Sequence, residues 1–192
     1  MPQAELAQHT VDEFLAWDER QAERHELVGG SPRMRAGASN VHDRIVVNLI
    51  RELSIRLRGS RCRPFTGDGA VETFAGQIRR PDAGVDCGSF VPDSYKAMEP
   101  RMVVEVLSPS TRDFDAFGKL AEYQAVGTLD YILVVEPNAA EVALWSRRAD
   151  RVWEMSRIEG HDRTVEMPAL SLELPLSEIY DGISFPAGRG AP

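Results

Sequence analysis

The stretch MVVEVLSPSTRDFDAFGKLAEYQAVGTLDYILVV, residues 102–135, decides the fold. Its first six residues, 102–107, and its last five, 131–135, are mostly apolar runs typical of strands that are buried on both faces. Between them the sequence predicts a turn at 108–111 and a helix over 113–126, which Gly127 ends. A strand, a helix and a second strand in this order predict a βαβ crossover between parallel strands of one sheet.

Glu105 places a carboxylate inside the first of these buried strands. Removing an ionised carboxylate from water costs several kcal/mol unless a cation, a metal ion or several hydrogen-bond donors compensate it. Glu105 therefore belongs either to a functional site or to a buried ion pair with an arginine such as Arg44 or Arg79. A charged group in such a strand favours the functional site.

Two acidic residues upstream extend this candidate site. Asp82 follows a proline at the start of a strand-like run, and Glu26 lies in another short run, residues 26–28. Taken singly, Asp82 is interpreted as a turn or edge residue and Glu26 as a solvated one. Together with Glu105 they would form an acidic cluster of the kind that holds Mg²⁺ through oxygen ligands. The cluster points to metal-dependent phosphodiester chemistry.

The remaining segments alternate between predicted helices and hairpins. A capping box formed by Thr10 and Glu13 begins a helix that we expect to end near residue 24. Strands at 26–28 and 32–35 follow, joined by a glycine turn. Further along we expect an amphipathic helix over 40–58, a hairpin that pairs residues 70–74 with 80–87, and a hairpin that pairs 141–147 with 151–158.

Composition and charge bound the function. At 192 residues and 43% hydrophobic, the chain suits a single α/β domain over residues 1–185, followed by a flexible C-terminal tail at 186–192. It has no apolar run long enough to span a membrane and no signal-peptide pattern, so we expect a cytoplasmic protein without membrane contact. The net charge of −8 argues against broad affinity for nucleic acid. Cys62 and Cys87 are interpreted as ordinary small hydrophobic residues rather than a disulfide.

Lys119 is notable because only two of the 22 basic residues are lysine. An ammonium group can orient or help to deprotonate a water molecule in a way that a guanidinium cannot, although an ordinary exposed lysine is the simpler interpretation. Tyr123 lies four residues later on the same helix face and could point toward the acids. His42 falls on the apolar face of the helix over 40–58, where a core histidine is the common case, and we keep it as a possible neighbour of the site.

Taken together, these residues resemble a family. The match rests on Glu26, Pro81-Asp82, Val104-Glu105-Val106-Leu107-Ser108-Pro109-Ser110-Thr111, Lys119, Tyr123, Gly127 and Tyr131. The chain resembles, over residues 10–185, the bacterial "putative restriction endonuclease" family of the PD-(D/E)XK nuclease superfamily, many of whose members have no known function. The resemblance implies a restriction-endonuclease-like α/β core, in which helices flank a central mixed β-sheet. It also implies Mg²⁺-dependent cleavage of DNA, with Mn²⁺ as a substitute and often by a homodimer.

One position departs from the superfamily pattern. The usual lysine lies two residues after the acid, where this chain has Leu107, and the resemblance implies that Lys119 on the next helix takes its place. On this hypothesis Asp82, Glu105 and the backbone carbonyl of Val106 bind Mg²⁺, while Glu26 binds that ion or a second one. Lys119 then orients the attacking water or neutralises the transition state.

Two other hypotheses stay open at this point. The first is a catalytically inactive nuclease-like module that binds a protein or a nucleic acid, which the acidic charge and the missing lysine favour. The second is an α/β domain whose acids are simply ion-paired with arginines.

Overall fold

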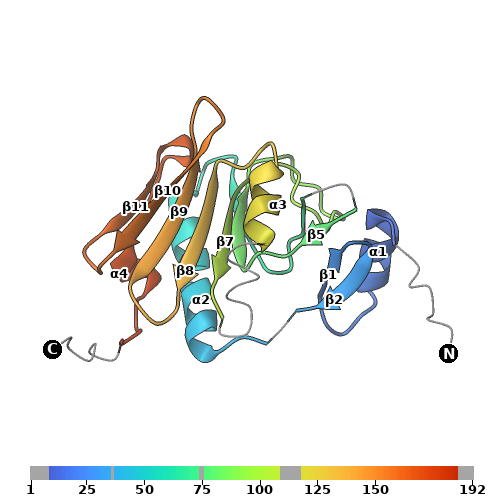
Figure 1. The fold of residues 1–192 in the computed structure, drawn as a ribbon, viewed down its shortest axis with the longest axis horizontal. Helices are drawn as coiled ribbons and strands as arrows, with labels where there is room; N and C mark the ends of the chain where they lie inside the picture. Colours follow the sequence, from blue (N-terminus) through green and yellow to red (C-terminus); the bar gives the residue numbers. More distant parts are fainter. Residues whose placement is uncertain (1–8, 36, 74–75, 109–117, 186–192) are drawn as a thin grey trace.

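The computed structural model describes residues 9–35, 37–73, 76–108 and 118–185, and its centre is a six-stranded mixed sheet (Figure 1). In spatial order the strands are β10 (Trp153–Glu159), β9 (Glu141–Arg147), β8 (Tyr131–Glu136), β7 (Pro100–Val106), β6 (Ala83–Asp86) and β3 (Arg63–Thr66). β7 and β8 run parallel, and the other neighbouring strands of this sheet are antiparallel. The two apolar runs therefore form the parallel pair that the sequence predicts.

Helices lie on both faces of this sheet. α2 (Asn40–Arg56) packs on one face, where Ile45, Leu49 and Leu53 join the inward side chains of β6, β7 and β8 in the main hydrophobic core. α3 (Leu120–Ala125) lies on the opposite face (Figure 1), and its buried Tyr123 belongs to a second apolar cluster. Side chains alternate along β7, so that its even-numbered residues face α2 while Glu105 faces α3. The sheet thus delivers Glu105 to the α3 side.

A smaller sheet lies beside the end of β7 (Figure 1). Its spatial order is β2 (Ser31–Met34), β1 (His25–Val28), β5 (Ile78–Arg79) and β4 (Val71–Glu72), and α1 (Val11–Asp18) covers it. Phe14, Leu27, Ala70 and Ile78 form its fully buried core. This sheet brings Glu26 of β1 toward the larger sheet.

The C-terminal part forms elements that the sequence reading leaves without assignment. β11 (Thr164–Met167) and β12 (Leu172–Pro175) form a hairpin around a 3₁₀ turn at Pro168–Leu170, and α4 (Leu176–Ile179) follows. Asn48 of α2 is buried and donates its amide hydrogens to the carbonyls of Ile179 and Asp181, at 3.0 Å each. This contact ties the C-terminal segment to the back of α2.

One predicted hairpin is wrong. Residues 80–87 do not form one strand paired with 70–74, because β5 pairs with β4 and β1 in the small sheet while β6 pairs with β3 and β7 in the large one. Asp82 therefore lies in the link between the two sheets, one residue before β6. The change of sheet has a physical cause, since Arg80 is drawn into a buried ion pair with Asp18 at 2.7 Å.

Asp18 also explains a shorter first helix. α1 ends at Asp18, not near residue 24, because the buried Asp18 carboxylate accepts the backbone N–H of His25 and the guanidinium of Arg80. The capping box of Thr10 and Glu13 is present as predicted. The second helix and the two strands at 26–28 and 32–35 are confirmed within two residues.

The two cysteines form a disulfide, so the prediction of independent small hydrophobic residues is wrong. Antiparallel pairing places Arg63 opposite Asp86, and one step further along the register puts Cys62 opposite Cys87. Their Cα atoms are 4.0 Å apart although 25 residues separate them in the chain.

Several sequence predictions fall outside this description. The turn beyond Ser108, the first part of the third helix and the tail at 186–192 lie outside the described residues. One domain over residues 1–185 stays a prediction. Within the described part of the chain, no helix has the length and apolar character needed to cross a membrane.

Candidate active site

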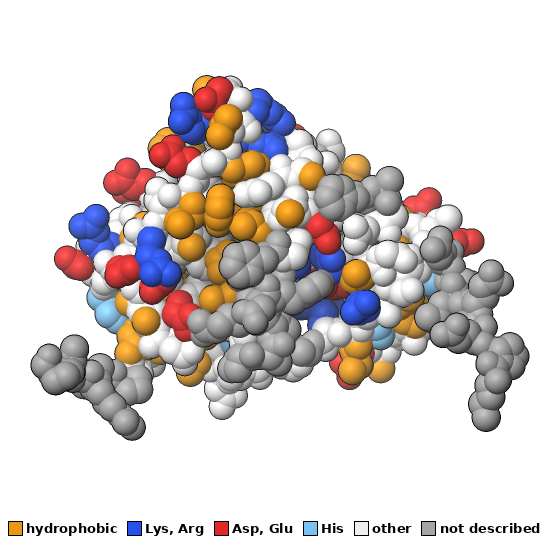
Figure 2. Space-filling view, viewed as in Figure 1, with side chains coloured by type: hydrophobic (Ala, Val, Ile, Leu, Met, Phe, Trp, Pro, Cys, Tyr) orange, Lys and Arg blue, Asp and Glu red, His pale blue; other side chains and the backbone are white. Residues whose placement is uncertain are grey.

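A cleft of about 420 Å³ lies between the small sheet and the ends of β6 and β7. Figure 2 shows blue and red side chains gathered in this hollow, beside the part of the molecule that carries β1 and β2. All four predicted catalytic residues line it, as do the other predicted metal ligand and the predicted neighbour on α2: Glu26, Asp82, Glu105, Lys119, Val106 and His42. The fold thus brings together residues from five separate segments of the sequence.

Asp82 and Glu105 are brought together by strand pairing. Ala83 of β6 is opposite Val104 of β7, so one further step in the antiparallel register puts Asp82 across from Glu105. The backbone N–H of Val106 donates to Asp82 Oδ2 at 2.8 Å and fixes that carboxylate beside the end of β7. Both acids are buried.

Asp82 has two basic neighbours. Arg35 donates from Nη2 to Asp82 Oδ1 at 2.8 Å, and His42 Nε2 lies 3.1 Å from Oδ2. Burial alone would raise the pKa of Asp82, but the contacts with His42, the Val106 N–H and Arg35 outweigh it and hold the pKa below its ordinary value. Asp82 is therefore an ionised carboxylate at neutral pH. His42 thus lies beside Asp82 in the cleft, although it is on the helix face that the sequence predicts to be apolar.

Glu105 is the more perturbed of the two acids. Its side chain accepts a hydrogen bond from the Tyr123 hydroxyl at 2.7 Å, and Lys119 Nζ lies 3.3 and 3.4 Å from its two oxygens. The pKa of Glu105 is raised to about 7. Burial is the largest cause, the negative charges of Asp82 and Glu26 act in the same direction, and Lys119 and Tyr123 act in the opposite direction. A second positive charge close to Glu105 would therefore stabilise its ionised form.

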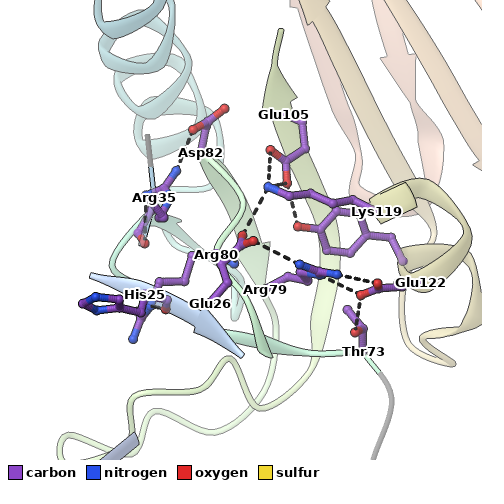
Figure 3. Close-up of polar contacts among 12 residues, drawn as sticks. His25, Glu26, Arg35, Thr73, Arg79, Arg80, Asp82, Glu105, Lys119 and Glu122 are labelled. Atoms are coloured by element: carbon purple, nitrogen blue, oxygen red, sulfur yellow. Dashed lines mark hydrogen bonds and ion pairs between the residues drawn. The ribbon is translucent and has the colours of Figure 1, made fainter. Parts of the chain in front are cut away.

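Glu26 shares Lys119 with Glu105. Lys119 Nζ lies 3.2 Å from Glu26 Oε1, which also accepts the backbone N–H of Arg80, and Arg79 donates to the other oxygen at 3.1 Å. Burial by itself would raise the pKa of Glu26, but Lys119, the Arg80 N–H and Arg79 lower it below its ordinary value. Figure 3 shows Lys119 directed at both carboxylates.

Arg79 continues this network away from the cleft. It is 1% exposed and donates to both oxygens of Glu122 on α3, at 2.7 and 2.5 Å (Figure 3). The sequence reading considers Arg79 only as a partner for Glu105, and it misses Arg35 and Glu122. Arg35 comes directly after a short strand and has no pattern to mark it. For Glu122 the available signal is its position on the helix, one residue before Tyr123.

The oxygen donors in the cleft suit a hard cation held by two carboxylates. The sequence predicts a cluster of three acids instead. Among the described residues, no group of three His, Cys, Asp or Glu side chains is placed to hold one metal ion. Asp82 and Glu105, with the nearby carbonyl of Val106, offer hard oxygen ligands, and Mg²⁺ is commonly held by one or two carboxylates together with water and substrate phosphate. The pKa of Glu105 is raised mainly by burial and further by the charges of Asp82 and Glu26, and a bound cation would favour the ionised carboxylate.

Comparisons with known proteins identify sequences that are similar to this chain. A family model described as "Uma2: Putative restriction endonuclease" matches residues 11–177. The chain is 31% identical over 189 residues to an uncharacterized protein, slr1290, of Synechocystis sp., and the match covers 96% of this chain and 97% of the relative. A second uncharacterized Synechocystis protein, sll1609, is 26% identical over 176 residues, covering 85% of this chain and 94% of the relative.

A solved structure shares the fold. The crystal structure of a putative nuclease belonging to DUF820 from Anabaena variabilis aligns with a TM-score of 0.72 at 19% identity, covering 89% of this chain and 97% of that one. The likeness confirms the predicted fold class, a nuclease-like α/β core with a central mixed sheet flanked by helices.

Proposed function

This chain belongs to the Uma2 family of "putative restriction endonucleases", and on that premise we propose that it is a Mg²⁺-dependent endonuclease that hydrolyses phosphodiester bonds of DNA. The observation that carries the proposal is the pairing of Asp82 with Glu105 in the cleft, with Lys119 Nζ 3.3 Å from Glu105. Two buried carboxylates and a lysine in one cleft supply the ligands and the positive charge that such a reaction requires.

Asp82, Glu105 and the Val106 carbonyl are the residues that would hold the metal ion. When bound, Mg²⁺ supplies a Lewis acid for the scissile phosphate and lowers the pKa of a coordinated water molecule. The Val106 N–H and the Tyr123 hydroxyl hold the two carboxylates in place, each through a hydrogen bond no longer than 2.8 Å. The protein's contribution is thus a pre-organised pair of oxygen ligands.

Lys119 is the residue that places positive charge next to the reacting phosphate. Two carboxylates, Glu26 and Glu105, hold its ammonium group in the cleft, and its side chain is 9% exposed. From this position it orients the attacking water or donates to a phosphate oxygen as negative charge builds there. Glu26 acts chiefly by holding Lys119, and because its carboxylate also lines the cleft it could bind a second ion.

The overall negative charge is offset locally. Arg33 is exposed on β2 at the wall of the cleft, where Arg35, Arg79 and Lys119 also lie, so positive side chains concentrate around the acids. A phosphodiester would therefore meet cations at the cleft even though the whole chain carries a net charge of −8.

The proposal is tested by measuring Mg²⁺-dependent cleavage of plasmid and single-stranded DNA by the wild type and by Asp82→Ala, Glu105→Ala and Lys119→Ala. Each substitution should lower the cleavage rate by at least about 100-fold, because each removes a metal ligand or the charge next to the phosphate. Glu173→Ala removes an exposed carboxylate on β12, away from the cleft, and should cleave at the wild-type rate. Unchanged cleavage in the Asp82 and Glu105 variants would refute the assignment, and a wild type that binds DNA without cutting it would support the inactive module instead.

A further inference from the structure

Arg35 already occupies the carboxylate that the proposed function assigns to the metal ion. It follows β2 directly, and its Nη2 donates to Asp82 Oδ1 at 2.8 Å (Figure 3). Its side chain is 29% exposed and lines the cleft. A metal ion and a guanidinium cannot both lie close to the same carboxylate oxygen without strong repulsion, so the two cations compete for Asp82.

We propose that Arg35 is a phosphate-binding residue that leaves Asp82 when the metal ion binds there and pairs instead with a phosphate oxygen of the DNA. The inference rests on the proposed function, which it extends by assigning a substrate contact. In the metal-free protein Arg35 compensates the buried charge of Asp82. In the complex with metal and DNA, the ion takes over that role and the guanidinium becomes available to the substrate.

The contacts of Arg35 are those of a side chain that can move. Among the described residues, the Arg35 side chain donates one hydrogen bond besides that to Asp82, a long one of 3.4 Å from Nη1 to the carbonyl of Gly67. Arg79 in the same cleft is its opposite, since it is 1% exposed and held by two carboxylates through three hydrogen bonds of 2.5 to 3.1 Å. Arg79 is therefore fixed in place, whereas Arg35 is held mainly at the end of its side chain.

The chemistry of the guanidinium matches a phosphate. Its planar fork can donate two parallel hydrogen bonds to a phosphate group. Because Arg35 and Asp82 line the same cleft, a phosphate held next to a metal ion on Asp82 would lie on the side of the cleft where Arg35 is. The guanidinium could then exchange one anionic partner for the other without leaving the cleft.

Metal affinity gives the first test. Calorimetric titration of Mn²⁺ into the Arg35→Ala variant should show binding about tenfold tighter than in the wild type, because no guanidinium has to be displaced from Asp82. The matched control is Arg33→Ala, which removes the same charge from the wall of the same cleft. In the part of the chain that the structure describes, Arg33 donates no hydrogen bond to Asp82. Its Mn²⁺ affinity should stay within about twofold of the wild type.

DNA binding gives the second test. We expect Arg35→Ala to bind a labelled DNA duplex more weakly in Ca²⁺, and the slope of log affinity against log salt concentration to become shallower by about one. Arg58→Ala is the control for net charge, because Arg58 is exposed beyond the far end of α2. The variant should retain the wild-type slope.

The outcomes separate this inference from the function on which it rests. Equal or weaker Mn²⁺ binding in Arg35→Ala, with clear binding in the wild type, would overturn the role of Arg35 and leave the metal site standing. No Mn²⁺ binding in either protein would overturn both. An unchanged salt slope would refute the phosphate contact. If Arg35→Ala does not fold, Arg35→Gln keeps a hydrogen-bond donor for Asp82 without the charge and should show the same tighter Mn²⁺ binding.

Discussion

The stability of the Glu105→Gln variant shows whether Glu105 is a functional carboxylate or one partner of a structural ion pair. Burial raises the pKa of Glu105 from its ordinary value of 4.5 to about 7 in the folded protein. A group with a raised pKa contributes stability that is fully present below about pH 4.5 and is lost as the pH rises through 7. At about 1.4 kcal/mol per pKa unit, the difference between 4.5 and about 7 corresponds to roughly 3 kcal/mol.

Glutamine cannot ionise, so this loss is absent from the variant. The free energy of unfolding of Glu105→Gln, relative to the wild type, should therefore rise by about 3 kcal/mol between pH 4.5 and pH 8. Lys119 keeps Glu26 as a partner in the variant, at 3.2 Å in the wild-type structure, so its charge is not left alone. The use of a difference between two pH values cancels any constant effect of the substitution on packing.

Urea unfolding of both proteins at several pH values between 4.5 and 8 measures this difference. A relative stability that falls with increasing pH would mean that the ionised carboxylate stabilises the fold, as in a structural ion pair with Lys119. A difference that does not vary with pH would mean that the pKa of Glu105 is not raised. Either result would refute the interpretation of Glu105 as a functional acid whose ionised form is destabilised by burial.

Three further predictions concern the neighbours of the site. Arg79→Ala should lower the free energy of unfolding by about 3 to 5 kcal/mol, because it leaves Glu26 and Glu122 without their shared cation; chemical denaturation measures it, and a loss below about 1 kcal/mol would contradict the network. Tyr123→Phe removes the hydroxyl that donates to Glu105 and should raise the pKa of that acid further. A pH profile of cleavage should then be displaced to higher pH, and an unchanged profile would contradict this prediction. Asn48→Ala removes two hydrogen bonds to the segment around α4 and should cost about 2 kcal/mol, measured by thermal unfolding; an unchanged melting temperature would mean that other contacts anchor this segment.

Much of the fold was predictable because its signals are local. The apolar runs that become β7 and β8, and the helix that follows β7, are contiguous in sequence, and their order fixes the parallel pairing. Glu105 stands out for the same reason, as a charge within a buried run. Lys119 and Tyr123 are four residues apart, so a shared direction toward Glu105 follows from helix geometry.

The failures concern pairings between segments far apart in the chain. The glycine turn that precedes Asp82 predicts a hairpin, whereas the structure places Asp82 next to Arg35, His42 and the end of β7. The disulfide likewise depends on the register of β3 against β6, which no local pattern reveals. The β11–β12 hairpin has a local signal, because apolar residues alternate at 165, 167, 172 and 174. No strand is predicted there, so this pattern was missed.

The most direct test of the metal site at Asp82 and Glu105 is calorimetric titration of Mn²⁺ into the wild type and into the Asp82→Ala/Glu105→Ala variant, each with a DNA oligonucleotide present to supply phosphate. The account predicts saturable binding of Mn²⁺ to the wild type that the double variant lacks. Equal binding in both proteins, or none in the wild type, would contradict the claim that these two carboxylates hold a catalytic metal ion.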